Sequence, residues 1–301
     1  MRQPLDPQLL ETFLAVLQHG RISAAARAVH LSQPAVTARM RKLEETVGAP
    51  LLVRSVRGVT PTPAGERLAA RARELQRLLD EIAGEVAVDD DAALGPLHVA
   101  ASTTIAAHVL PRVLARFRAR HPDLPIELRV GNTEEVVDAV RSGAFPLGLV
   151  EGTKRAAGVK LSTWVDDQLL PVVGATADWR VRSVRDLENV PILWREQGSG
   201  TRAVVAKALR AAGVRHTPGD RDAVLGTSSA IAGAVAAGMG IAFLSRWALG
   251  AEFASGRLVP LAGLDLRIVR TFQWALPAGA LTGTAASFHD FATRNPPSPS
   301  T

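Results

Sequence analysis

The chain has 301 residues, a formal net charge of +6 and no cysteine, and 47% of its residues are hydrophobic. That length suffices for a small domain and a larger one, while the missing thiols exclude disulfides, cysteine nucleophiles, zinc–thiolate sites and cysteine-based redox sensing. No apolar run reaches the roughly 18 residues that cross a bilayer, and no secretory segment opens the chain. We therefore expect a soluble, cytoplasmic protein without a membrane partner.

The charge changes sign along the first third of the chain. Residues 1–62 carry eight basic and four acidic side chains, whereas residues 63–94 carry four basic and eight acidic ones. A net positive block suits a nucleic-acid partner, because lysine and arginine neutralise phosphates. The sign change also marks a boundary between two parts of the chain.

The first 62 residues predict a winged helix-turn-helix. Capping residues precede the second and third helical patterns at Ser23 and Ser32, and Gly20 and Gly48 provide left-handed stops. A tight turn at Arg57 joins two short apolar segments, which indicates a wing. The predicted elements are helices over residues 7–19, 24–29 and 33–47 and strands over residues 51–53 and 59–60.

Residues 63–90 predict a helix with a narrow apolar seam. Its apolar positions step by four, three, four, three and four residues, an a/d heptad pattern, and charged residues crowd the other faces. We expect a linker helix through which two copies dimerise, ahead of the alternative that the stripe packs only against the chain's own first domain. The seam consists of Leu68, Ala72, Leu75, Leu79, Ile82 and Val86.

From residue 91 onward, short apolar runs alternate with longer helical patterns, which predicts an α/β domain of two lobes. Lobe I is expected over residues 91–165 and 269–295 and lobe II over residues 166–268, each boundary being approximate, with residues 296–301 as a disordered tail. The predicted strands cover residues 97–101, 126–130, 147–150, 169–173, 191–194, 223–225, 241–245 and 272–276. The predicted helices cover residues 105–120, 134–142, 201–212 and 230–237, and a last one passes through Phe288 and Phe291.

Several stretches together resemble one family, the LysR-type transcription regulators. Residues 24–37 (AAARAVHLSQPAVT), 43–54 and 60–65 (TPTPAG) are similar to its DNA-binding half, and residues 195–202 (REQGSGTR) and 236–244 (AAGMGIAFL) to its effector domain. The resemblance implies an α/β protein with an N-terminal winged helix-turn-helix, a linker helix and a C-terminal two-lobed periplasmic-binding-protein-like effector domain over residues 91–295. It also implies a homodimer or homotetramer that binds double-stranded DNA. The motif REQGSGTR is similar to that of regulators of sulfur assimilation and of carbon fixation.

The expected base-reading side chains lie on the third helix and in the wing. The amide of Gln33 suits adenine edges, Pro34 suits a thymine methyl, and arginines read guanine or grip phosphates. Ala38 stands where many relatives have a base-reading arginine, so recognition falls to the other positions. For Thr37 and Arg39 the alternative is an ordinary solvated helix face. The candidate DNA-binding residues are Ser32, Gln33, Pro34, Thr37, Arg39, Arg41 and Arg57.

Hydroxyl-rich helix starts follow three predicted strands, at residues 102–104, 199–201 and 227–229. Helix N-termini with nearby hydroxyls favour an anionic ligand, and in a two-lobed fold such turns converge beside the ligand. The sequence therefore predicts a small anionic effector, against the alternative that each start is only a helix cap. Arg202 and Glu151 are expected in the cleft, unless both are surface residues. The candidate effector-binding residues are Ser102, Thr103, Thr104, Glu151, Ser199, Gly200, Thr201, Arg202, Thr227 and Ser228.

Other classes of protein find less support. Ser199 lacks the flanking residues of a nucleophile elbow, no phosphate-binding or dinucleotide fingerprint occurs, and the seven histidines show no metal-ligand spacing. We therefore predict no enzyme activity, no catalytic residue, no metal and no cofactor. Two alternatives stay open: an effector-independent DNA-binding or nucleoid protein, and a cytoplasmic solute-binding protein.

Overall fold

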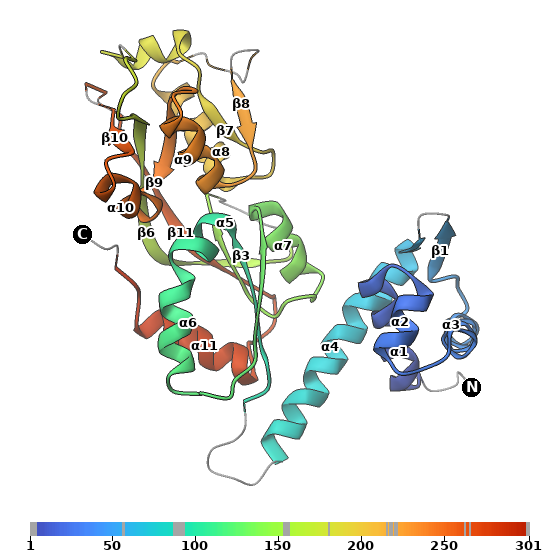
Figure 1. Cartoon of the computed structure of the whole chain (residues 1–301). Helices are drawn as coiled ribbons and strands as arrows, with labels where there is room; N and C mark the ends of the chain where they lie inside the picture. Colours follow the sequence, from blue (N-terminus) through green and yellow to red (C-terminus); the bar gives the residue numbers. More distant parts are fainter. Residues whose placement is uncertain are drawn as a thin grey trace. The chain divides into compact units, whose positions relative to one another are not determined.

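The computed structural model describes residues 5–55, 58–86, 94–152, 157–179, 181–214, 216, 219, 222–261, 263–264 and 266–298 (Figure 1). The chain forms two compact units, one of residues 1–93 with 142–144 and the other of residues 94–141 with 145–301. Within the described ranges, none of the helices combines the length and apolar character that a membrane crossing requires.

The first unit is a winged helix-turn-helix followed by a long helix. As predicted, Gly20 and Gly48 end helices in the left-handed region, with φ of 63° and 77°. Ser32 caps the third helix, because its Oγ accepts from the Ala35 N–H at 3.3 Å. The elements are α1 (Pro7–His19), α2 (Ile22–Ala28), α3 (Gln33–Val47), β1 (Leu52–Ser55), β2 (Gly58–Pro61) and α4 (Pro63–Val86).

The second helix begins earlier than the sequence predicts. Its N-cap is Arg21, which makes no side-chain capping bond, so Ser23 lies inside the first turn and is not the cap. The wing explains the shift, since Val59 N–H donates to the Gly20 carbonyl at 2.8 Å and fixes the chain just before α2. Ile22 packs against the core of the unit, so burial favours the earlier start.

The predicted apolar seam of α4 is partly buried within the first unit and partly exposed. Leu68 and Ala72 pack into the core of the first unit, as the alternative interpretation had it. Leu75 and Leu79 are 38% and 47% exposed and take no part in that core. The side chains of Ile82 and Val86 lie outside the described residues. Only the second half of the seam therefore remains available to a partner.

The second unit is an α/β domain in which helices alternate with strands (Figure 1). Its elements are β3 (Leu97–Ser102), α5 (Thr103–His108), α6 (Leu110–Arg118), β4 (Ile126–Gly131), α7 (Thr133–Arg141), β5 (Gly148–Glu151), β6 (Lys160–Gly174), η1 (Val184–Asn189), β7 (Leu193–Arg195), α8 (Gly200–Ala211), β8 (Ala223–Leu225), α9 (Ser228–Ala236), β9 (Ala242–Ser245), α10 (Arg246–Ala254), β10 (Leu258–Pro260), β11 (Ile268–Leu276) and α11 (Gly283–Arg294).

Two long strands connect the lobes of this unit. The main sheet has the order β10-β6-β11-β5-β3-β4, with β9 also paired to β6, and β7 and β8 form a separate pair. β3 is parallel to β4 and β5, as predicted, whereas β6 and β11 are antiparallel. One core gathers around Phe117, Trp274 and Phe288 and another around Trp194 and Phe243, so each lobe has its own interior. The strand expected over residues 169–173 is one end of β6.

The single helix expected over residues 105–120 is two helices. α5 and α6 meet at Val109, whose φ and ψ are −115° and −55°. Pro111 follows in the first turn of α6, where its missing N–H costs no hydrogen bond, but it could not have donated within a continuous helix. Proline therefore sets the break.

Candidate DNA-binding and effector-binding sites

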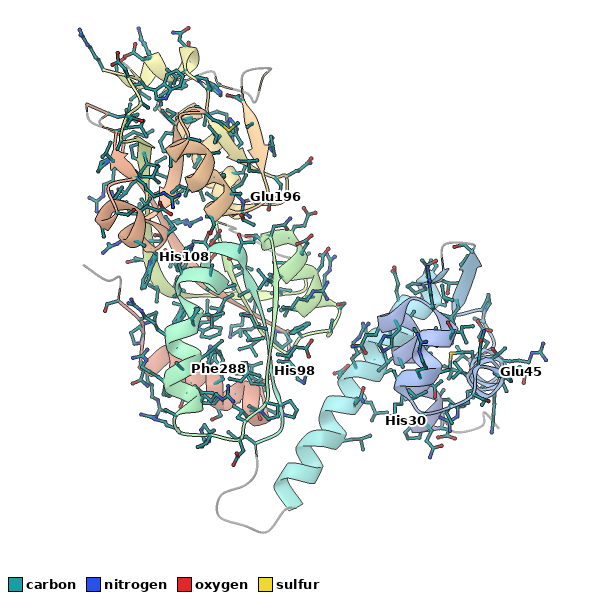
Figure 2. All side chains as sticks on the ribbon, in the orientation of Figure 1. His30, Glu45, His98, His108, Glu196 and Phe288 are labelled. Atoms are coloured by element: carbon teal, nitrogen blue, oxygen red, sulfur yellow. The ribbon has the colours of Figure 1, made fainter. Side chains whose placement is uncertain are left out.

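The exposed face of α3 lines a surface groove of about 930 Å³. Of the predicted DNA-binding residues, the groove brings together Gln33, Pro34, Thr37 and Arg41. Positions three and four apart share a helix face, and this spacing could have identified the residues that the prediction missed. Figure 2 shows one of them, Glu45, on α3. The residues that line the groove and were not in the predicted set are Ala38, Lys42, Glu45 and Thr46.

Arg39 does not belong to this groove. Its Nη1 donates to Thr12 Oγ1 at 2.9 Å and its Nη2 to Gln8 Oε1 at 3.2 Å, and both partners lie on α1. Arg39 therefore fixes α3 against α1, and its contact with DNA stays a prediction. Arg57 lies outside the described residues, and Ser32 is exposed at the cap of α3.

Gln33 also borders a second, smaller hollow of about 260 Å³ at the base of the wing. That hollow is lined by Arg21 and Ser23 at the start of α2 and by Ser55, Gly58 and Val59 of the wing strands, together with Ile22. Gln33 thus stands where the α3 face meets the wing. Of the residues described in the first unit, it is the one that lines both hollows.

In the second unit, one buried carboxylate accepts hydrogen bonds from hydroxyls at the hydroxyl-rich helix starts. Glu151 ends β5 and is 1% exposed. Its Oε2 accepts from Ser102 Oγ at 3.1 Å, and its Oε1 accepts from Thr104 Oγ1 at 3.2 Å and Thr201 Oγ1 at 3.0 Å. Thr104 in turn shares a 3.3 Å hydrogen bond with Ser228 at the start of α9. Ser102, Thr104 and Thr201 thus donate to the chain's own carboxylate, and their contact with an effector stays a prediction.

An ion pair between β6 and β11 also contacts the cluster of side chains around Glu151. Arg270 on β11 stands opposite Asp167 on β6, and its Nε donates to Asp167 Oδ2 at 2.7 Å. Its Nη1 donates to Thr201 Oγ1 at 2.7 Å and lies 3.3 Å from Glu151 Oε1. Ser245 Oγ donates to Asp167 Oδ1 at 2.8 Å. Burial raises the pKa of the Asp167 carboxyl above its usual value, and the Arg270 guanidinium offsets only part of that rise.

Gly200 has a packing role, and its contact with a ligand stays a prediction. A Cβ on Gly200 would overlap the carbonyl oxygen of Glu151 and come within 2.7 Å of Thr133 Oγ1. Thr133 Oγ1 itself donates to that same carbonyl at 3.0 Å. Glycine thus allows the start of α8 to lie directly against the end of β5.

The other predicted effector residues have separate roles. Ser199 and Thr227 are the capping residues of α8 and α9, and their side chains accept from the helix backbone at 3.5 Å and 3.1 Å. Arg202 Nη1 donates to the Arg195 carbonyl at 3.1 Å. Thr103 Oγ1 is buried and has no hydrogen-bond partner among the described residues. Of the predicted hydroxyls, Thr103 is therefore one that the protein itself leaves unused.

Sequence reasoning missed Arg270, Asp167 and Arg195, all of which are at most 6% exposed. A signal for Arg270 was present, because it shares the buried phase of β11 with Ile268, Phe272 and Trp274 by strict alternation. No comparable local signal marked Asp167, since its burial depends on the pairing of β6 with β11 and β9.

The loop before α8 also contacts the start of α7. The N–H of Glu134 donates to the Gly198 carbonyl at 3.3 Å, and Asn132 Nδ2 donates to the Gln197 carbonyl at 3.4 Å. Glu196, labelled in Figure 2, begins this loop and accepts two 2.8 Å bonds from Arg195. The two lobes are thus joined by backbone contacts as well as by the carboxylate cluster.

The histidines pack against other side chains. His289 lies edge-on against Trp274 with ring centroids 4.8 Å apart, and burial lowers its pKa. Burial also lowers the pKa of His108, which the charge of Glu252 opposes. In the part of the chain that the structure describes, no three His, Asp or Glu side chains are placed to hold a metal ion.

Comparison with known protein families gives two matches that together span most of the chain. Residues 7–66 match the family described as "Bacterial regulatory helix-turn-helix protein, lysR family". Residues 90–296 match the family described as "LysR substrate binding domain". The first match covers the three helices and the wing, and the second covers the unit that holds the Glu151 cluster.

Individual proteins agree with these matches. The chain is 32% identical over 241 residues to the HTH-type transcriptional regulator CysL of Bacillus subtilis, covering 79% of this chain and 80% of CysL. The crystal structure of ArgP from Mycobacterium tuberculosis aligns with a TM-score of 0.72 at 20% identity, covering 97% of both chains. The regulatory domain of CcmR from Synechocystis PCC6803, solved in complex with 2-PG, aligns with a TM-score of 0.59 at 26% identity, covering 68% of this chain and all of that domain.

Proposed function

The chain belongs to the LysR family of bacterial transcription regulators, and from this premise we propose that it recognises a specific DNA sequence under the control of a small anionic effector. It is a regulator and not an enzyme. The observation that carries the DNA-binding part is the exposed, partly basic face of α3, whose side chains line one groove beside the wing.

We assign the parts of the chain as follows. Residues 1–62 bind DNA, residues 63–90 are the linker, of which Pro63–Val86 is the helix α4, and residues 91–295 bind the effector. Within the last, lobe I takes residues of about 91–165 and 269–295 and lobe II those of about 166–268, so that β6 and β11 pass from one lobe to the other. The tail predicted over residues 296–301 lies partly outside the described residues, which end at residue 298.

Recognition of bases falls mainly to Gln33. It is exposed at the first residue of α3, and a helix-turn-helix presents the N-terminal residues of its recognition helix to base edges. Arg41 and Lys42 lie further along the same groove and suit phosphate contacts. Arg39 supports this face from behind through its bonds to α1.

Replacing Gln33 by alanine should relax sequence preference. A bidentate amide contact to adenine discriminates by about 1–3 kcal/mol, so the ratio of affinities for target and scrambled duplexes should fall roughly 5- to 150-fold. The side chain is exposed, so folding should be unaffected. Fluorescence anisotropy with both duplexes over a series of salt concentrations measures the ratio.

The matched control is Arg41→Ala on the same groove. Loss of a phosphate contact should weaken both duplexes alike and reduce the slope of log affinity against log salt by about 1. An unchanged preference in the Gln33 variant would remove Gln33 from the base-reading set. A wild-type chain that binds target and scrambled duplexes equally would instead favour a nucleoid protein.

The effector is proposed to be a small anion held at the starts of α5, α8 and α9. Helix N-termini attract negative charge, and the hydroxyl side chains at these starts can donate to an anion. The Thr103 hydroxyl supports this proposal because it is buried and unused by the described residues. That the similar CcmR domain was solved in complex with 2-PG supports ligand binding by this unit.

Thr103→Val should weaken the effector without altering DNA affinity in its absence. Loss of one buried donor costs about 1–3 kcal/mol, and valine keeps the shape of the side chain. Thermal-shift titration with sulfate, phosphate, short carboxylates and neutral compounds gives the comparison. Thr163→Val, at an exposed position of β6, is the control and should respond like the wild type. Stabilisation by neutral compounds alone, intact in Thr103→Val, would exclude the anion.

The working form is proposed to be a homodimer through the exposed half of the α4 seam, or a homotetramer in which the effector units also pair. Leu75 and Leu79 are the described seam residues that support the dimer, because the first unit does not bury them. Two helix-turn-helix units in one assembly can bind two half-sites.

A further inference from the structure

One amino group of the buried Arg270 has no hydrogen-bond partner among the described residues, although the guanidinium is paired with the carboxylates of Asp167 and Glu151. The Arg270 side chain is 2% exposed, and its Nε and Nη1 donate to Asp167 and Thr201. Its Nη2, in contrast, is buried and has no hydrogen-bond partner among the described residues. A guanidinium cannot release its proton, so the two N–H bonds of Nη2 are obligatory donors that lack an acceptor.

An unmet buried donor costs roughly 1–3 kcal/mol, and more when it is charged. An oxygen atom supplied by a ligand would recover this free energy. The positive end of the α8 dipole favours an anion beside Arg270, because Arg270 bonds Thr201, the second residue of that twelve-residue helix. The carboxylates of Asp167 and Glu151 oppose an anion at the same guanidinium, so its binding depends on the hydrogen bond from Nη2.

We propose that Arg270 is an effector-binding residue that receives an oxygen of a small oxyanion on Nη2. The inference rests on the proposed anionic effector and adds the residue that reads its charge. Arginine suits this role because its planar guanidinium donates to Asp167 through Nε while Nη2 has no partner among the described residues.

An anion bound to Nη2 would also affect the two strands that connect the lobes. Arg270 on β11 and Asp167 on β6 are opposed residues of the two strands that pass between the lobes. Through Nη1 the same guanidinium contacts α8 and lies 3.3 Å from Glu151 on β5. An anion on Nη2 therefore acts on an ion pair that already ties both lobes together.

The test uses the purified full-length chain and titration calorimetry with inorganic sulfate and inorganic phosphate, with glycerol as the neutral probe. Arg270→Lys keeps the charge but loses the planar guanidinium, so affinity for the anion that binds the wild type should fall at least tenfold. Asp167→Asn is the control for disturbance of the same ion pair. It leaves Nη2 in place and removes a negative charge, so it should bind that anion as tightly as the wild type or more tightly.

A second measurement requires no variant. In wild-type protein labelled with 15N at arginine, the buried Nη signals should shift on addition of the anion and not on addition of glycerol. Three results would each overturn the role of Arg270 alone. The first is equal anion affinity in Arg270→Lys and wild type, and the second is an equal loss of anion affinity in Arg270→Lys and Asp167→Asn. The third is that the Nη signals do not shift while the anion binds. A wild-type chain that binds no small oxyanion, including short carboxylates, would overturn it together with the anionic effector, while DNA recognition by α3 would stand.

Discussion

Replacing Leu75 and Leu79 together by lysine should separate the protein into single chains and weaken binding to a two-half-site operator by about 10²- to 10⁴-fold. Both leucines are more than a third exposed in the single chain, so the substitution costs the first unit little. In a seam, however, four lysines from two chains would face one another in an apolar interface. Each chain would then retain the affinity of one half-site only.

Sedimentation equilibrium gives the mass of the assembly, and anisotropy with whole and half operators gives the affinities. Gln76→Lys is the matched control, because it adds a lysine at an exposed position of the same helix outside the predicted seam. That control should stay dimeric and bind the whole operator like the wild type. A double variant that sediments as a dimer would show that α4 is not the interface.

Gly200→Ala should destabilise the second unit by at least about 3 kcal/mol, through overpacking and a disturbed buried ion-pair cluster. The added methyl group would collide with the backbone carbonyl of Glu151, which cannot rotate away as a side chain could. α8 would have to move off β5, and Thr201 would lose its bonds to Glu151 and Arg270. For a unit of this size the melting temperature should fall by roughly 6–12 °C.

Calorimetric melting measures this change, and Gly250→Ala is its control. Gly250 is exposed in α10 and a Cβ there would meet no atom within 4 Å, so alanine should stabilise the helix by up to about 1 kcal/mol. A Gly200 variant that melts like the wild type would show that α8 does not need this close approach. Loss of the effector without loss of stability would support the ligand contact predicted for Gly200.

Local chemistry made the DNA-binding half predictable. Gly20, Gly48 and Ser32 end or cap helices at the expected positions, because left-handed geometry and capping hydroxyls depend on a few neighbouring residues. Ser23 failed as a cap because the wing strand bonds to the Gly20 carbonyl, a contact between residues far apart in sequence. The bonds of Arg39 to α1 could not be predicted for the same reason, since its partners Gln8 and Thr12 lie far from it in sequence.

In the effector half, the sequence predicted the elements but not the contacts between their side chains. The sequence identified the hydroxyl-rich starts of α5, α8 and α9, and Glu151 beside them, because strand ends and helix starts follow from local pattern. The sequence could not show that Glu151 accepts hydrogen bonds from Ser102, Thr104 and Thr201. These bonds depend on where β5 lies relative to the starts of α5 and α8.

By itself, then, the sequence determined the family, most of the elements and the helix ends at Gly20, Ser32 and Gly48, because these follow from spacing, charge and backbone preference within short segments. The tertiary structure alone decided which polar groups meet. Arg270 and Asp167 lie 103 positions apart and become partners only through the register of β11 against β6. A buried charge is stabilised only by the groups brought to it, so its role is set by packing between distant segments.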